Sequence, residues 1–282
     1  MFWITIFVVL PVREAPMAQV SVAIQNRVKN ARYVCSSVST HVDKLSQLLA
    51  KKLKLTEADT KKFLLALHDT LESDAQALDT KEQKYINEQA DQPPAQLGRD
   101  REFQIAVGAF EHVRFQLLGL QDEQLLKTYG IPTVIPGTPD KLLATLQHAV
   151  PRLLKDTTPI VNEALLDQLV TSGVDKDQAK ATASVVPAYL GKLLDLRAKS
   201  LKAALDKVQR EKRETQDALS ERDAFLSEWA NTYQGVATAL EGLYRLVEQN
   251  KLADNVRPTS RRRRGEDLSE TPIDDVIETP ES

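Results

Sequence analysis

The sequence is poor in cysteine, aromatic residues and glycine. Cys35 is the only cysteine among 282 residues, which excludes an intrachain disulfide and a metal site built from several thiolates. Aromatic residues make up 5% of the chain and glycine only ten positions, so the composition favours helices built from Leu, Ala, Lys, Glu and Gln. A lone cysteine also fits a reducing compartment, and we expect a cytoplasmic protein.

The sequence also lacks a strong excess of charge of either sign. Lys and Arg number 37 against 40 Asp and Glu, which gives a formal net charge of -3. Such a balance creates no general field that would attract nucleic acid or an anionic membrane. Binding of either would therefore have to rely on a local cluster of basic residues.

Long apolar runs are missing as well. Residues 1–10 are almost wholly apolar, but they are about half as long as the ~20 residues that cross a bilayer. No basic segment precedes them, as one would in a secretory signal. We therefore expect translation to start at Met17, with residues 1–16 as an extension. The alternatives are a signal peptide, or membrane association through residues 1–12.

No residue pattern typical of an active site occurs. The sequence has no glycine-rich phosphate-binding loop followed by Lys and Ser or Thr, and no Gly-x-Ser-x-Gly turn. The histidines fall on different predicted helices and lack the spacings of helical metal motifs. They are His41, His68, His112 and His148. We expect a protein without catalytic, cofactor-binding or metal-binding residues and without a small-molecule substrate, rather than an enzyme.

What the sequence does contain is a long heptad pattern between residues 201 and 247, called the seam below. Its positions alternate in steps of four and three and are apolar except at Lys212, Thr215 and Arg222. This spacing predicts a helix that packs one stripe against a partner helix, in the same chain or in another. The seam residues expected to carry association are Leu219, Leu226, Trp229, Tyr233, Val236, Leu240 and Leu243.

The segments upstream of the seam also read as helices. A basic helix over residues 17–55 and an acidic helix from residue 56 predict an antiparallel hairpin, with Thr56 as the N-cap of the second helix. Pro93-Pro94 is expected to end that helix, because a proline inside a helix removes a hydrogen bond and clashes with the preceding turn. A third helix is expected from about residue 96 to Tyr129.

The rest of the chain predicts a loop, short helices and one long helix. Prolines and glycines concentrate in residues 129–139, which predicts a loop. Short helices follow in residues 140–187, one from about Asp140 to Leu154 and one from Pro159 to Thr171 that is capped by Thr158. Residues 188–256 predict one long helix. We therefore expect an all-α fold, an elongated antiparallel helical bundle or coiled coil with a disordered C-terminal tail. The segments are residues 1–16, 17–128, 129–139, 140–187, 188–256 and 257–282.

The tail begins with a run of arginines and continues as an acidic stretch, a composition typical of disorder. The arginines could bind the phosphates of nucleic acid or anionic lipid, or could belong to a solvated linker. Apolar residues in the acidic stretch have the i, i+3, i+4 spacing of a short helix that binds in a groove. The tail residues expected to contact a partner are Arg261, Arg262, Arg263, Arg264, Ile273, Val276 and Ile277.

Together these patterns predict a helical scaffold or adaptor. Its seams would pack within the chain or between copies in a homo-oligomer, and its tail would recruit a protein partner. Two alternatives remain open at this point. One is a membrane-associated helical bundle that uses the apolar N-terminal segment, and the other is a phosphate-binding regulator that uses Arg261–Arg264.

Overall fold

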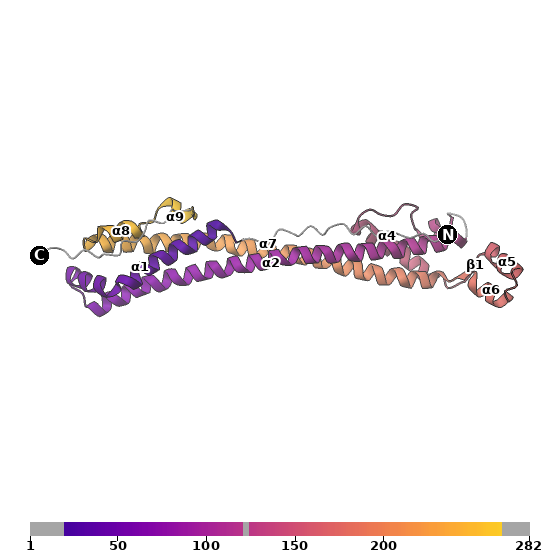
Figure 1. The fold of residues 1–282 in the computed structure, drawn as a ribbon, viewed down its shortest axis with the longest axis horizontal. Coiled ribbons are helices and arrows are strands. Elements are labelled where there is room, and N and C mark those ends of the chain that lie inside the picture. The colour runs from indigo at the N-terminus through magenta and orange to yellow at the C-terminus, as the bar shows by residue number, and fades with distance from the viewer. Residues whose placement is uncertain (1–19, 121–123, 267–282) are drawn as a thin grey trace. The chain divides into compact units, whose positions relative to one another are not determined.

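The computed structural model describes residues 20–120 and 124–266. They fall into two compact units, the first built from the chain up to Ala90 and from Glu214 onward, the second from Asp91 to Arg213. The elements in chain order are α1 (Val22–Leu53), α2 (Glu57–Leu120), α3 (Gln124–Tyr129), α4 (Pro139–Lys155), β1 (Ile160–Val161), α5 (Glu163–Thr171), α6 (Lys176–Thr182), β2 (Ser184–Val185), α7 (Pro187–Leu246), α8 (Asn250–Val256) and α9 (Ser260–Arg264) (Figure 1). The predicted all-α fold is confirmed.

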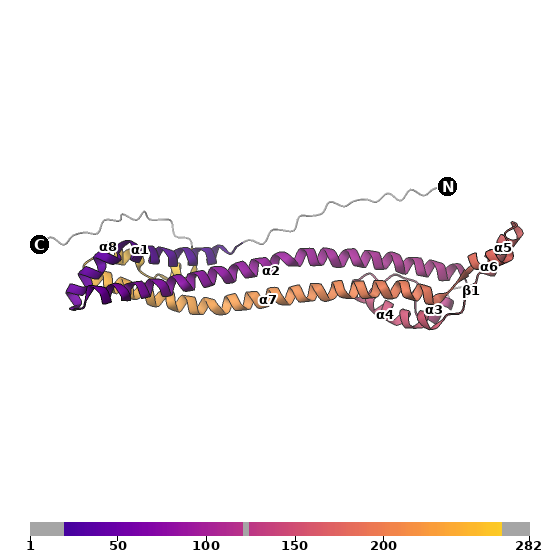
Figure 2. The ribbon, with the colours of Figure 1, turned by 90° about the horizontal axis from the view of Figure 1, so that it is seen from below.

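In the first unit, α1 and the beginning of α2 run side by side in opposite directions (Figure 2). The backbone N–H of Ser21, before α1, donates to Glu82 Oε1 at 2.7 Å. The Gln47 amide, close to the other end of α1, donates to Glu57 at 3.3 Å. Thr56 caps α2 as predicted, because its hydroxyl oxygen accepts the N–H of Asp59 at 3.1 Å.

The core of the first unit joins α1, α2, α7 and α8. Burial of its apolar side chains is the main favourable term that holds the four helices together. Fully buried members include Leu49, Leu64, Leu71, Leu78, Trp229, Tyr233, Leu240 and Tyr244.

The second unit packs the rest of α2 and the start of α7 against α3 and α4, around core residues that include Phe110, Leu117, Leu142, Leu153 and Leu194. The end of α4 is fastened to its neighbours through Asp156. Its carboxylate accepts the Tyr129 hydroxyl at 2.6 Å, and its carbonyl accepts the N–H of Ala188 at 3.0 Å. The hydrogen bond from Tyr129 lowers the pKa of Asp156. Gly191 lets α7 approach α4 closely, since a Cβ there would lie 3.0 Å from Leu153 Cβ.

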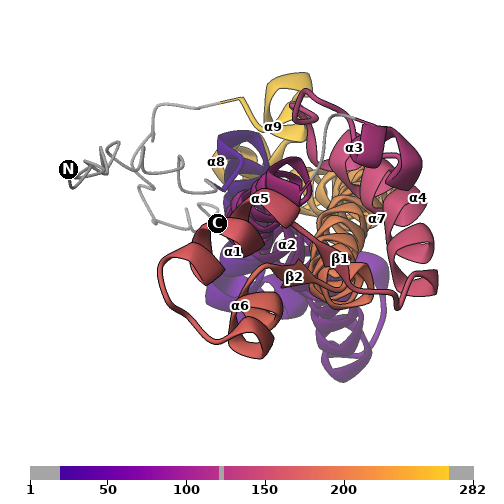
Figure 3. The same cartoon turned by 90° about the vertical axis from the view of Figure 1, so that its right-hand side faces the viewer.

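The helix predicted to start at Pro159 begins only at Glu163, after the short strand β1, and ends at Thr171. The expectation that Thr158 caps a helix starting at Pro159 is wrong, because Ile160 and Val161 pair antiparallel with Val185 and Ser184. β-branched residues favour this extended conformation. The hairpin of α5 and α6 connects the two paired strands (Figure 3). Asn162, and not Thr158, caps α5.

Pro93 and Pro94 do not end the second helix, contrary to the prediction, since α2 continues through both to Leu120. The helix predicted from residue 96 is therefore the continuation of α2. Proline has a φ angle compatible with a helix, and two adjacent prolines deprive only two carbonyls of their donors. Ala95 and Ala106 are buried just after the prolines, so packing beyond them offsets the cost.

The long helix predicted over residues 188–256 is interrupted near its end. α7 stops at Leu246, Glu248 adopts a positive φ of 64°, and α8 begins at Asn250. The N–H groups of Val247 and Gln249 both donate to the carbonyl of Tyr244, which closes the turn. The break brings Leu252 and Val256 of α8 into the core of the first unit.

The tail predicted to be disordered from residue 257 is ordered as far as Glu266, because α9 forms there. Residues 267–282, like residues 1–19, lie outside the described residues. Over the two described ranges, every helix falls short of the length or the apolar character that crossing a bilayer requires.

Candidate interaction site at the C-terminal arginine cluster

Six of the seven seam residues expected to carry association lie in or against the core of the first unit, whereas Leu201 and Leu205, at the start of the seam, lie in the core of the second. Trp229, Tyr233, Val236 and Leu240 are buried, and the side chains around them come from α1, α2 and α8 of the same chain. The remaining three are half-buried: Leu219, Leu226 and Leu243. The contacts that we see for the seam are therefore those of folding within one chain.

Two aromatic seam residues form the centre of this core. The rings of Trp229 and Tyr233 are stacked, with centroids 5.1 Å apart and planes 9° from parallel. Trp229 Nε1 and the Tyr233 hydroxyl are buried and make no hydrogen bond within the described residues. Burial raises the pKa of Tyr233 to about 12, although the nearby charge of Arg262 opposes the rise. The phenol therefore stays neutral throughout the physiological range.

The arginine cluster forms α9, which packs on α1. Thr259 caps its N-terminus by accepting the N–H of Arg262. The C-terminal carbonyls, which a helix leaves without internal partners, are bound by side chains of α1. Asn30 donates to the carbonyl of Arg262 at 3.1 Å, Arg27 to that of residue 263 at 3.1 Å, and Asn26 to that of residue 265 at 3.0 Å.

Gly265 allows the approach of these two helices. It ends α9 with a φ of +72°, a conformation that favours glycine. A Cβ at this position would lie 2.0 Å from the carbonyl oxygen of Ala23 in α1. Two independent requirements, the positive φ and the space, therefore call for glycine at the point where α9 meets α1.

The four arginines of the cluster all have partners within the first unit. Arg262 donates to the carbonyls of Asn255 and Arg257, and its guanidinium lies over the ring of Tyr33. Arg261 and Arg264 both form ion pairs with Glu266, at 3.2 and 2.7 Å.

The fourth arginine, Arg263, donates to Gln234. Phosphate binding by this cluster would therefore compete with existing contacts, which weakens that interpretation. The other tail residues predicted to contact a partner, Ile273, Val276 and Ile277, lie outside the described residues.

The first unit contains a buried ion pair that the sequence did not predict. Glu82 is 1% exposed and binds Arg222 at 3.0 Å, while its other oxygen accepts the N–H of Ser21. The guanidinium of Arg222 also lies 4.8 Å from the centre of the Tyr85 ring. The position of Arg222 on a mostly apolar seam indicated that this arginine needs a partner, but the sequence did not identify Glu82 as that partner.

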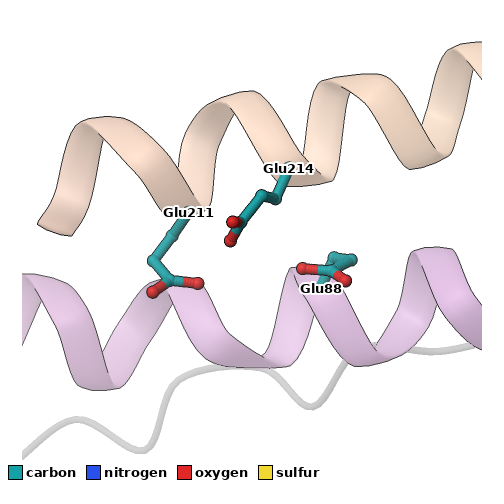
Figure 4. Close-up of side chains that lie close together, drawn as sticks. All are labelled: Glu88, Glu211 and Glu214. Atoms are coloured by element: carbon teal, nitrogen blue, oxygen red, sulfur yellow. The ribbon is translucent and has the colours of Figure 1, made fainter.

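Possible metal ligands were also sought among the described residues. None of the described histidines, nor Cys35, belongs to a group of three or more ligands close enough to share an ion. Glu88 of α2 and Glu214 of α7, both in the first unit, bring carboxylate oxygens within 4.8 Å of each other (Figure 4). Glu214 is exposed, and exposed carboxylates commonly meet without an ion, so we assign no metal site.

The second unit contains a shallow groove between α4 and α7. Its volume is about 240 Å³, below the ~300–1,000 Å³ of typical small-molecule sites. The lining residues are Leu143, Gln147, Val150, Pro151, Asp195, Ala198, Lys199 and Lys202. Asp195 and Lys199 pair with each other at 2.6 Å, which leaves Gln147 and Lys202 as the other polar side chains of the groove.

Known proteins give no further guidance. No model of a protein family, no curated protein and no solved structure matches this chain. Its function must therefore be argued from its own residues.

Proposed function

We propose that this protein is a non-enzymatic helical scaffold or adaptor that recruits a protein partner through residues 267–282. The observation that supports this proposal best is the docking of α9 on α1. Three side chains of α1 bind the end of α9, and Gly265 fits against Ala23. The point at which the tail leaves the first unit is therefore fixed.

Fixing the base of a tail has a consequence for binding. Docking of α9 shortens the flexible connection between the first unit and the tail, so a partner that contacts both would lose less conformational freedom on binding than with a longer linker. A tail that served solubility alone would gain nothing from such docking. The acidic stretch with apolar Ile273, Val276 and Ile277 has the pattern of a short amphipathic ligand.

The seam has a different role in this proposal. Because Trp229, Tyr233 and Leu240 are fully buried within the first unit, exposing them to a second chain would require the core to open. We therefore assign the seam to folding and the tail to recruitment. The buried free thiol of Cys35 fits the reducing cytoplasm that we propose as its location.

Affinity capture from native lysate tests the proposal. The full chain is compared with a chain ending at Glu266, which retains α9, and with an Ile273→Ser/Val276→Ser/Ile277→Ser variant. Leu268→Ser makes the same kind of change elsewhere in the tail and serves as the control. We expect one partner to be enriched by the full chain and the control, and to be lost from the other two. Equal capture of the partner by all four chains would show that the tail does not recruit it.

A second variant tests the docking of α9 separately. Gly265→Ala should release α9 while leaving the tail sequence unchanged. We expect faster tryptic cleavage at Arg261–Arg264 and weaker capture of the same partner. Gly242→Ala is the control, since a Cβ there meets no atom within 4 Å. If α9 is released and the partner is captured as before, the docking of α9 on α1 does not contribute to recruitment by the tail.

A further inference from the structure

The residues in the turn between α1 and α2 are not the types that its backbone conformation favours. The N–H groups of Lys54 and Leu55 both donate to the carbonyl of Ala50, and Lys54 has a φ of 58° and a ψ of 38°. This is the geometry of a helix end at which glycine is preferred, followed by an apolar residue that packs back on the helix. Here lysine occupies the glycine position, and Leu55 is 56% exposed. The local sequence is thus not the one that folding alone would select.

Other apolar side chains near this turn are exposed too. Leu53 precedes it and is 43% exposed, and Phe63 follows on α2 at 51%. All three side chains lie outside the apolar core of the first unit. Every residue from 51 to 59 is exposed, and so are Lys62 and Phe63, whereas Thr60 is buried. The exposed residues of this turn, residues 51–59 with Lys62 and Phe63, form a surface called the tip below.

Lysines alternate with these apolar residues. Residues 51–62 carry five lysines and two acidic residues in a chain whose net charge is -3. Lys61 pairs with Asp43 of α1 at 2.5 Å, so the positive charge of this segment rests mainly on the other four lysines. Both acidic groups are engaged locally, Glu57 with Gln47 and Asp59 with Thr56. Lys51, Lys52 and Lys54 are all exposed. Positive charge and apolar surface therefore occur together at the tip.

We propose that the tip is a docking surface for anionic lipid membranes. Leu53, Leu55 and Phe63 would enter the boundary between headgroups and acyl chains, while the lysines would bind lipid phosphates. Alternating basic and apolar side chains suit that boundary, where the two kinds of group lie a few ångströms apart. A lipid surface fits better than an acidic peptide because the tip is exposed and offers no groove. With so few apolar groups, binding should be weak and sensitive to salt.

Flotation of the full chain with lipid vesicles tests this proposal. One set of vesicles is pure phosphatidylcholine, and the other is an equimolar mixture with phosphatidylglycerol. We expect the protein to float only with the anionic vesicles and to be released by high salt. Leu53→Ser/Leu55→Ser and Lys51→Gln/Lys52→Gln/Lys54→Gln should each reduce binding by about tenfold or more. Leu97→Ser/Phe115→Ser changes exposed apolar residues of the second unit and should leave binding unchanged.

A further variant separates lipid binding from folding. Lys54→Gly supplies the residue that the backbone prefers and removes one charge, so it should keep or raise thermal stability while weakening flotation. Flotation that persists in both tip variants would overturn the proposal and transfer binding to another segment such as residues 1–12. Equal flotation with neutral vesicles, or none with anionic ones, would also overturn it. These outcomes leave the proposed recruitment by the tail unaffected.

Discussion

Glu82 and Arg222 form an ion pair inside the first unit that also holds the start of α1. One carboxylate oxygen of Glu82 binds Arg222 at 3.0 Å, and the other accepts the N–H of Ser21 at 2.7 Å. A second carboxylate, that of Asp223, binds the remaining donors of Arg222 at 2.9 and 2.7 Å. A single buried carboxylate thus connects α1, α2 and α7.

Removing this carboxylate should be costly. Glu82→Ala leaves the mostly buried guanidinium of Arg222 with Asp223 as its carboxylate partner but removes the bond to α2, and it leaves the N–H of Ser21 without its acceptor. We expect a loss of about 1–3 kcal/mol in the free energy of unfolding, measured by urea denaturation. Lys84→Ala breaks the neighbouring pair of Lys84 with Glu221, in which both side chains are 50% exposed, and should change the stability much less because water screens the pair. Similar losses in the two variants would mean that water reaches Glu82.

The two buried tyrosines of α7 should respond differently to loss of their hydroxyl groups. Tyr244 shares a hydrogen bond with the Ser37 hydroxyl at 2.9 Å, so Tyr244→Phe should destabilise the protein by about 1 kcal/mol. The Tyr233 hydroxyl has no hydrogen-bond partner within the described residues. Tyr233→Phe should therefore be neutral or stabilising in the same urea assay. An equal loss would indicate a partner for Tyr233, such as Arg262 or a bound water.

The free energy of unfolding should fall at alkaline pH, because the buried Cys35 thiol and Tyr233 hydroxyl keep their protons in the folded protein but lose them in the unfolded chain. Burial, followed by the charge of Glu72, raises the pKa of Cys35 from 9.0 to about 12, and burial raises that of Tyr233 from 10.0 to about 12. Above pH 9 the unfolded chain loses protons that the folded chain retains, so unfolding becomes more favourable as the pH rises towards 12. Each group can contribute a slope of up to about 1.4 kcal/mol per pH unit.

Cys35→Ala isolates the contribution of the thiol. The substitution has a constant packing cost, but between pH 9 and 11 the variant should lose about 1–2 kcal/mol less stability than the parent. Urea denaturation across this range measures the difference. Parallel stability curves would show that the thiol ionises as easily in the folded state as in the unfolded state. Reaction of native Cys35 with a thiol reagent at pH 8 should be slow for the same reason.

Heptad spacing predicted the helical fold and most of the buried stripe on α7. It placed Trp229, Tyr233 and Leu240 in the core, where they are found, but then continued to Leu243, whereas Tyr244 is the fully buried residue. An α-helix that stays straight has 3.6 residues per turn, so a pattern read at 3.5 drifts by about 20° per heptad. After a few turns the buried position has moved by one residue.

Contacts between distant segments could not be predicted in the same way. The docking of α9 depends on Asn26 and Asn30, which precede Gly265 by more than 230 residues along the chain. None of them carries a periodic signal. Asparagine is ordinary on a helix surface and glycine is ordinary at a helix end, so only the folded structure shows that they meet.

The local preference of proline predicts a helix end at Pro93-Pro94, but this preference does not include the packing on either side of the two prolines. Both prolines lie inside α2. A proline in a helix interior costs about 3 kcal/mol relative to alanine, and replacing it also frees the unfolded chain by about 0.4–1 kcal/mol. Pro94→Ala should therefore stabilise the protein by about 1–3 kcal/mol and slow amide hydrogen exchange around residue 94.

Pro139 provides the matched control for this last prediction. It stands at the start of α4, where its missing N–H would have no helical partner. Pro139→Ala should thus be slightly destabilising, by about 0.4–1 kcal/mol, since it only makes the unfolded chain more flexible. Opposite signs for the two substitutions would show that helix context decides the effect of proline in this chain. If Pro94→Ala is also destabilising, the helix geometry imposed by Pro94 is itself required for packing.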